Sequence, residues 1–310
     1  MPVPNPAERI KKVLDGVRRL ALRGVRRERR PYVLTATDAG LCACRIQALA
    51  GRARIERFHW QGGARLEDLP TLQRSWSLPA GPVAALLSAQ DYLTLVVDDP
   101  PVPEDELARA LVWQLRDRLP FPPEEAVLGR LSLPQQDKST SWVAVARRDV
   151  CERLHAAYRD TGLHLRAIDV EEGAQRNLAA LIEPAGGAIC LLHVGARDAL
   201  LTVNAGSELL LSRRLERRAG EEDDDRLALE VQRVLDYADR HLRALAIARL
   251  YLAPLPGQDE HCRRLEGLLT VPVQPLRLDA IMDPGRHEPL ADLEVQRQAW
   301  FALGLALRWA

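Results

Sequence analysis

Apolar residues in the first hundred positions follow the spacing of short strands. Runs of β-branched, aromatic and small apolar residues alternate with turns, as expected for strands joined by tight connections. The predicted strands cover residues 32–37, 41–48, 53–60 and 92–97, and we interpret the last of them as buried. The turn Asp38-Ala39-Gly40 separates the first two strands. Residues 78–87 are interpreted as a short segment or a helix.

A helix that ends in a proline-rich elbow is the most informative element of the chain. Its apolar stripe consists of Leu107, Leu111, Leu115 and Leu119. Acidic residues 104–106 precede the stripe and arginines occupy the last turn, which matches the charges to the helix dipole. The prolines of residues 119–123 cannot continue a helix, and they favour extended geometry in the residues before them. The sequence therefore predicts a rigid elbow and then a strand over residues 127–133.

The order of elements repeats in the second half of the chain. Strands over 142–146 and 165–170 and helices over 149–161 and 171–181 complete the first half, and Pro184-Ala185-Gly186-Gly187 marks the clearest boundary. The strands predicted beyond it cover 188–194, 199–203, 209–215 and 249–253, and the helices about 227–242, 260–269 and 293–309. Each half opens with a strand, a glycine turn and a hairpin, which indicates duplication of one α/β unit.

The N-terminal segment predicts a basic amphipathic helix over residues 8–27. Apolar residues recur on one face at helical spacing. The flanking basic residues are Lys11, Lys12, Arg18, Arg19, Arg23, Arg26 and Arg27. This face could contact an anionic membrane surface or a partner protein. Alternatively, the helix packs on its own domain and leaves a solvated basic face.

Charge is unevenly distributed in a chain whose net charge is zero. Residues 1–30 contain ten Lys or Arg against three acidic residues, so the remainder carries an equal excess of acid. Nucleic acid is therefore a poor partner, since the basic residues are also not interleaved with aromatic ones. The 310 residues, of which 47% are hydrophobic and 28% charged, suit a globular protein of two domains or two joined lobes.

Cysteine usage and hydropathy indicate a cytoplasmic chain. The five cysteines are Cys42, Cys44, Cys151, Cys190 and Cys262. Their odd number and spacing fit no disulfide framework. Cys42 and Cys44 would share one strand face, and without a second pair we interpret them as buried cysteines and not metal ligands.

The acidic run Glu221 to Asp225 predicts a solvated loop with no metal-ligand spacing. The N-terminus lacks the apolar core of a secretory signal, and the longest apolar run, residues 299–307, is too short to span a bilayer.

Two strand–turn–hairpin units, each followed by helices, resemble the actin-like (ribonuclease H-like) fold. Further segments resemble the PilM family of type IV pilus assembly proteins, and its MSHA-type members in particular. These segments are residues 119–125, 146–148, 162–171 and 229–237, within a match that extends over about residues 30–308. The resemblance implies an α/β protein with a duplicated actin-like fold, in which each of two lobes has a mixed five-stranded-type sheet flanked by helices.

The resemblance also implies a division of the chain. We expect the basic N-terminal helix in residues 1–30, the first lobe in 31–186 and the second lobe in 187–289. A C-terminal helix in residues 290–310 is expected to pack back on the first lobe.

The nucleotide-binding elements of this fold are degenerate in the sequence. Active members of the fold place an Asp-x-Gly turn in each lobe around the nucleotide phosphates. Asp38 and Gly40 keep the first turn, although Leu41 and Cys42 stand where those members place small hydroxyl residues. The second turn reads His193-Val194-Gly195, and neutral imidazole is a poor ligand for magnesium, which prefers oxygen.

The third nucleotide element, a Gly-Gly turn beside the adenosine, appears as Pro254-Leu255-Pro256-Gly257. Prolines remove backbone donors and stiffen a turn that should be open. We therefore interpret Asp38, Gly40, His193 and Gly195 as remnants of a cofactor site. No catalytic residue and no metal site are expected, and ATP with magnesium is disfavoured as a cofactor.

The resemblance implies a non-catalytic scaffold of a type IV, MSHA-like pilus assembly platform at the inner face of the inner membrane of a Gram-negative bacterium. The implied partner is the cytoplasmic tail of a bitopic inner-membrane assembly protein, PilN-like or MshJ-like. The alternative is a nucleotide-binding switch or a weak ATPase. A sugar or acetate kinase would need an intact phosphate loop and a catalytic carboxylate, and only Asp38 supports it. The histidines interpreted as surface or packing residues without a partner for catalysis are His59, His155, His164, His241, His261 and His287.

Overall fold

The computed structural model describes residues 30–49, 52–133, 139–182, 187–217, 223–241 and 246–310. The predicted N-terminal helix over residues 8–27, with its seven basic residues, lies outside these ranges. So do residues 184–186 of the predicted boundary and residues 221–222 of the acidic run.

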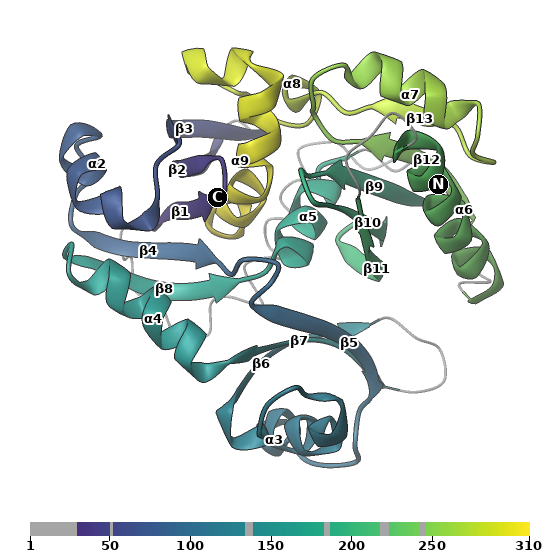
Figure 1. Cartoon of the computed structure of the whole chain (residues 1–310), viewed down its shortest axis with the longest axis horizontal. Helices are drawn as coiled ribbons and strands as arrows, with labels where there is room; N and C mark the ends of the chain where they lie inside the picture. The colour runs from purple at the N-terminus through teal and green to yellow at the C-terminus, as the bar shows by residue number, and fades with distance from the viewer. Residues whose placement is uncertain (1–29, 50–51, 134–138, 183–186, 218–222, 242–245) are drawn as a thin grey trace.

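Two five-stranded sheets with the same strand order form the body of the molecule (Figure 1). The first large sheet has the order β3-β2-β1-β4-β8. Its strands are β1 (Tyr32–Thr37), β2 (Gly40–Leu49), β3 (Arg52–Gly62), β4 (Gly81–Leu86) and β8 (Leu163–Asp169). The second large sheet has the order β11-β10-β9-β12-β13. Its strands are β9 (Ala188–Val194), β10 (Asp198–Ala205), β11 (Glu208–Glu216), β12 (Ile247–Leu252) and β13 (Val273–Pro275).

Strand directions repeat as well as strand order. In each large sheet the first three strands of the chain form an antiparallel meander, and the last two add in parallel. The predicted duplication of one α/β unit is therefore confirmed.

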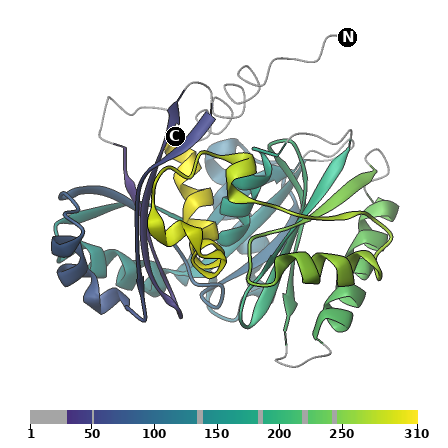
Figure 2. The same ribbon diagram turned by 90° about the horizontal axis from the view of Figure 1, so that it is seen from above.

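Helices cover both faces of each large sheet. They are α2 (Leu69–Ser75), α4 (Arg148–Arg159), α5 (Glu171–Ala179), α6 (Asp223–His241), α7 (Gln258–Glu266), α8 (Leu278–Ile281) and α9 (Leu293–Ala306). Helix α9 packs on the first large sheet and α5 on the second, and both lie between the two sheets (Figures 1 and 2). Helices α2 and α4 cover the outer face of the first sheet, and α6 and α7 that of the second.

The central pair of helices touches at a glycine. A Cβ atom at Gly304 of α9 would lie 2.3 Å from the backbone oxygen of Ala174 in α5, so only glycine permits this approach. Asn177 of α5 donates from Nδ2 to the Gly304 oxygen over 3.0 Å. Trp300 of α9 is completely buried in a core cluster that includes side chains from both large sheets. This contact places the two sheets on either side of one continuous core.

A third, small sheet has the order β5-β7-β6 and lies against the first large sheet and β11 (Figure 1). Its strands are β5 (Tyr92–Asp98), β6 (Ala126–Leu133) and β7 (Thr140–Arg147). Helix α3 (Glu104–Gln114) packs Leu107 and Leu111 against β7. The elbow follows as 3-10 turns over Arg116–Arg118 and Pro123–Glu125 and leads into β6, as the sequence predicts.

Two predictions for the first hundred residues are wrong. The helix alternative for residues 78–87 fails because β4 pairs with β1 on one side and β8 on the other in the first large sheet, with Val83 to Ala85 buried. A strand covered on both faces shows no alternation of apolar and polar residues. Residues 92–97 do form a strand, but β5 is an edge strand and mostly half-buried, with Val96 44% exposed.

The described part of the acidic run is not a solvated loop. Residues 223–225 form the first turn of α6, where the carboxylates of Asp224 and Asp225 interact favourably with the helix dipole. Asp224 is buried and accepts from His261 Nδ1, 3.0 Å from its Oδ2. His261 on α7 thus has a carboxylate partner that its sequence spacing did not reveal.

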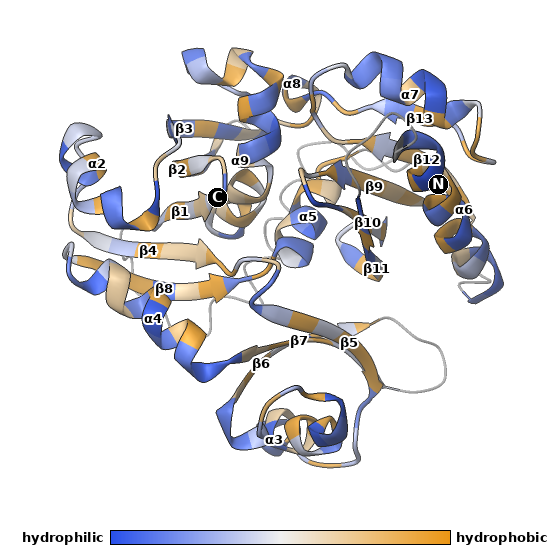
Figure 3. Cartoon of the chain, in the orientation of Figure 1, coloured by the Kyte–Doolittle hydropathy of each residue, from blue (hydrophilic) through white to orange (hydrophobic). Residues whose placement is uncertain are grey.

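Figure 3 shows the strands of the sheets mainly apolar and α7 mainly hydrophilic. None of the helices in the described ranges is long and apolar enough to cross a membrane.

Candidate functional site

The two turns expected to cradle phosphates face each other and are joined by an ion pair. Arg197, in the turn between β9 and β10, lies 3.0 Å from the Asp38 carboxylate in the turn between β1 and β2. Both side chains are mostly exposed. The structure therefore brings the predicted residue Asp38 to the second turn, where its carboxylate faces a guanidinium group.

Gly40 and Gly195 are required by the backbone of the turns themselves. A Cβ atom at position 40 would lie 2.2 Å from the Gln61 oxygen on the neighbouring strand β3. At position 195 it would lie 2.9 Å from the Asp198 oxygen across the hairpin. These close approaches explain both glycines without a nucleotide.

His193 points into the core and not into the space between the turns. Its Nε2 lies 3.0 Å from the backbone oxygen of Arg297 on α9, and its ring centroid lies 4.4 Å from that of Phe301. A ring nitrogen that contacts a carbonyl oxygen must carry the hydrogen, so Nε2 is a donor here. Burial lowers the pKa of His193 to about 4, which keeps the imidazole neutral at physiological pH. His193 therefore connects β9 to α9.

Polar side chains of α9 also reach toward the two turns. Arg297 donates from Nη1 to the Val194 oxygen over 3.3 Å and pairs with Glu294. Gln298 Oε1 lies 3.4 Å from the Thr37 hydroxyl at the end of β1. The ends of β1 and β9, where the phosphate turns begin, are thus linked through α9.

The segment at the third nucleotide element is likewise held by contacts within the protein. Leu255 is buried, and Gly257 adopts a left-handed conformation with φ of 70° before α7 begins. Gln258 then donates from Nε2 to the backbone oxygens of Leu252 and Leu276, at 2.8 and 3.2 Å. This glutamine ties the segment to the edge of the second large sheet. Across the described residues, no group of three or more His, Cys, Asp or Glu side chains is placed to hold a metal ion.

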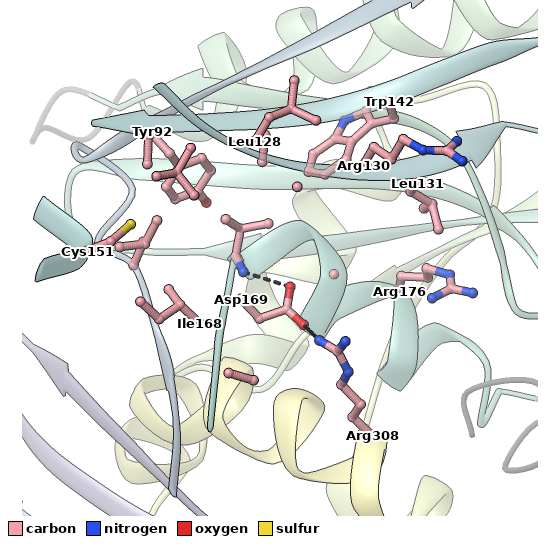
Figure 4. A pocket seen from close by; sticks show the side chains of 18 of the residues that line it. Tyr92, Leu128, Arg130, Leu131, Trp142, Cys151, Ile168, Asp169, Arg176 and Arg308 are labelled. Carbon is pink, nitrogen blue, oxygen red and sulfur yellow. Dashed lines mark hydrogen bonds and ion pairs between the residues drawn. The ribbon is translucent and has the colours of Figure 1, made fainter. Parts of the chain in front are cut away.

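A cavity lies away from these turns, between the small sheet and the first large sheet (Figure 4). It has a volume of about 590 Å³. The small sheet contributes residues 127–131 and the side chains of Tyr92, Trp142, Ala144 and Ala146. Strand β8 contributes residues 165–169. We call this cavity the junction pocket. Its remaining lining residues are Leu87, Cys151, His155, Val170, Gly173, Arg176, Asn177, Leu209 and Arg308.

The junction pocket is bounded by two strand edges. Within the described residues, β6 pairs only with β7, and β8 pairs only with β4. Each strand lines the pocket with five consecutive residues. Side chains alternate between the faces of a strand, so a strand contributes consecutive residues only when its edge faces the cavity. Backbone donors and acceptors of two different sheets therefore border the same space.

The pocket surface combines an apolar floor with charged margins. Leu131 and Ile168 pack in one cluster with the aromatic rings of Tyr92 and Trp142 (Figure 4). Asp169 accepts from Arg308 over 2.8 Å and, through Oδ1, from the Val170 backbone over 2.9 Å. Such a surface suits an extended peptide, because apolar side chains can enter the floor while the strand edges bind its backbone.

The pocket is not predicted by the sequence analysis, although two features of the sequence point to it. Gly129 interrupts a strand pattern, and a Cβ atom there would meet nothing within 4 Å. An isolated glycine in a strand can mark a place where another backbone approaches closely. The elbow before β6 is the second signal, because it turns the chain into the strand that borders the pocket.

The remaining predicted residues lie apart from one another. Cys42 and Cys44 are buried in the core cluster beneath α9, and Cys151 is the partly exposed cysteine beside the junction pocket. The histidines other than His193 and His261 are distributed as follows: His59 stacks on Trp76, His241 on Tyr237, His287 contacts the Ile55 oxygen, His155 lines the pocket and His164 is exposed.

Comparisons with known proteins establish the fold. No protein-family model matches the sequence, and the search of curated proteins gave no match. Among solved structures, a PilM–PilN type IV pilus biogenesis complex is similar with a TM-score of 0.71 and 17% identity, over 91% of this chain and 98% of that chain. A Bacteroides thetaiotaomicron protein with an actin-like ATPase fold is similar with a TM-score of 0.51 and 10% identity, over 88% of this chain and 96% of that chain. The predicted actin-like fold is therefore confirmed.

Proposed function

We propose that this chain is a non-catalytic cytoplasmic scaffold of a type IV pilus assembly platform. Within that class we propose the MSHA type, with this chain in the role of MshI. Its partner would be the cytoplasmic tail of a bitopic inner-membrane protein, PilN-like or MshJ-like. The observation that carries the proposal is the junction pocket, a cavity bordered by two strand edges.

An extended peptide is the occupant that fits the pocket best. A strand edge binds a peptide through its main chain, and side-chain pockets then give specificity. The edges of β6 and β8 supply the backbone partners, and the apolar floor supplies the side-chain pockets. The similar solved structure contains PilM together with PilN, which supports a tail of this kind as the occupant.

The contacts of the two turns favour a scaffold over an enzyme. Catalysis of phosphoryl transfer depends on a positioned metal ion and on donors around the phosphates. Here the Asp38 carboxylate pairs with Arg197, and His193 is turned toward α9. The residues that would hold a magnesium nucleotide are thus engaged by protein groups.

A substitution that fills the pocket tests the proposal. Gly129→Leu would place its side chain in open space beside the floor, since positions 127, 129 and 131 share one face of β6. The probe is a synthetic peptide with the sequence of the PilN-like tail from the same organism, titrated calorimetrically. We expect the variant to bind about tenfold more weakly or not at all, with unchanged stability.

The matched control is Ser132→Leu, which adds the same side chain to an exposed position on the other face of β6. It should bind the peptide as the wild type does. Wild-type affinity in the Gly129 variant, or no binding to the unmodified protein, would rule out the junction pocket as the site for this tail.

A further inference from the structure

The aromatic rings of the junction pocket are held by the second large sheet. Trp142 of β7 donates from Nε1 to the Ser212 hydroxyl on β11 over 2.9 Å, and both side chains are buried. An indole N–H that is removed from water needs such an acceptor, and losing it leaves a buried donor unpaired. The orientation of the Trp142 ring therefore depends on a residue of another sheet.

Tyr92 of β5 is held in the same way, by a cluster of charged groups. Its hydroxyl donates to Glu172 over 2.8 Å and accepts from Arg214 Nη2 over 2.9 Å. Arg214, on β11, also donates to Glu171 over 2.8 Å, to Asp198 over 3.0 Å and to Glu172 over 3.1 Å. Only a planar guanidinium group offers enough fixed donors for four acceptors.

Ser212 and Arg214 are two positions apart on β11, so they project from the same face of the strand. Leu209, at the start of β11, lines the pocket itself. Strand β11 is an edge strand of the second large sheet. Strand β11 therefore borders the junction pocket at Leu209, and its contacts through Ser212 and Arg214 hold the two rings that lie on the small sheet.

We propose that Ser212 and Arg214 are positioning residues of the junction pocket, through which the second large sheet controls its peptide affinity. The inference rests on the proposed function, because it takes the occupant to be the partner tail. A shift of the second large sheet would move both anchors and the rings with them. By linkage, a peptide that fits the anchored rings would in turn favour the present arrangement of the sheets.

Two conservative substitutions with a matched control test this proposal. Ser212→Ala removes the acceptor for Trp142, and Arg214→Lys keeps the charge but loses the planar donor set. Arg213→Lys is the control, because Arg213 lies on the opposite face of β11, with its guanidinium over the Tyr237 ring. Two readouts are measured: affinity for the synthetic PilN-like tail peptide, and the rate at which a maleimide labels Cys151. The other four cysteines are buried, so Cys151 reports on the pocket without any peptide.

We expect Ser212→Ala and Arg214→Lys each to weaken peptide binding about fivefold and to accelerate Cys151 labelling by a similar factor. The Arg213 control should match the wild type in both. Near-UV circular dichroism checks the fold, and if Arg214→Lys does not fold, Ser212→Ala carries the test alone. Wild-type labelling and affinity in the folded variants would overturn the inference. If the peptide neither binds the wild type nor protects Cys151, the proposed function fails, while a labelling difference between the variants and the control still supports the positioning role.

Discussion

Glu171 opens helix α5 with a carboxyl group that shares the Arg214 guanidinium with Glu172 and Asp198. Burial raises the pKa of Glu171 to about 7, although Arg214 acts in the opposite direction. A carboxyl group with a higher pKa in the folded state stabilises the fold while it is protonated. This contribution is complete below the ordinary value of 4.5 and is lost as the pH rises through about 7.

The variant Glu171→Gln should therefore change how stability depends on pH. An amide keeps an oxygen for Arg214 and cannot ionise, so the variant avoids the cost that the wild type incurs as the pH rises. We expect the variant to gain about 1–3 kcal/mol over the wild type between pH 5 and 8. Urea unfolding at several pH values measures this gain. Glu152→Gln, an exposed change on α4, is the control and should show no such trend.

The sequence shows which residue types stand at the expected nucleotide site, but it does not show which residues their side chains contact. The sequence shows that His193 stands where the resemblance to nucleotide-binding members of the fold implies a carboxylate. It also shows that Asp38 is retained in the first turn. Their partners, Arg297 and Arg197, lie more than one hundred residues away along the chain. The pairing of His261 with Asp224 was missed for the same reason, since spacing along a chain does not report distance between helices.

Elements were predictable where their signals are local. Helix α3 and the elbow follow from a helical stripe and from prolines, which act on their immediate neighbours. Strand β4 was not predictable, because its extended form depends on pairing with β1 and β8. The acidic start of α6 also depends on tertiary contacts, in which Arg264 of α7 pairs with Asp224 and His261 is hydrogen-bonded to it.

Helix α9 provides a prediction at the scale of elements. Gly304→Ala would improve the intrinsic helix propensity, yet its Cβ atom would overlap the backbone of α5 at Ala174. We expect the substitution to destabilise the protein by about 1–3 kcal/mol, as overpacking does elsewhere. Gly267→Ala at the end of α7 is the matched control, because its nearest neighbour is 3.5 Å away. Equal midpoints of urea unfolding for the two variants would contradict a tight crossing of α5 and α9.

At the scale of the whole molecule, the sequence predicts the duplication of one α/β unit, but it does not predict the junction pocket. Two halves with the same order of elements predict two similar sheets, since each half carries its own turn and periodicity signals. The pocket draws on β6, β8, α5, β11 and Arg308, which come from distant parts of the chain. Only the packing of the small sheet against both large sheets brings them together. The proposed function therefore rests on an arrangement that no single segment encodes.

The same arrangement makes a prediction about nucleotides. In this fold a nucleotide would have to enter between the two turns, where Asp38 faces Arg197. The ends of β1 and β9 are held there through Gln298 and Arg297 of α9. An exposed ion pair contributes at most about 1 kcal/mol, so Arg197→Ala alone should not create a magnesium site.

We therefore expect calorimetric titration with ATP and magnesium to show no micromolar binding, either to the wild type or to Arg197→Ala. Asp38→Ala provides the decisive comparison, because that carboxylate is the retained part of the first turn. Micromolar binding to the wild type that weakens in Asp38→Ala would contradict the proposal of a pure scaffold and support a nucleotide-gated switch. Repeating the titration with the PilN-like tail peptide present then tests whether the two turns and the junction pocket act on each other, since any coupling must change both affinities by the same factor.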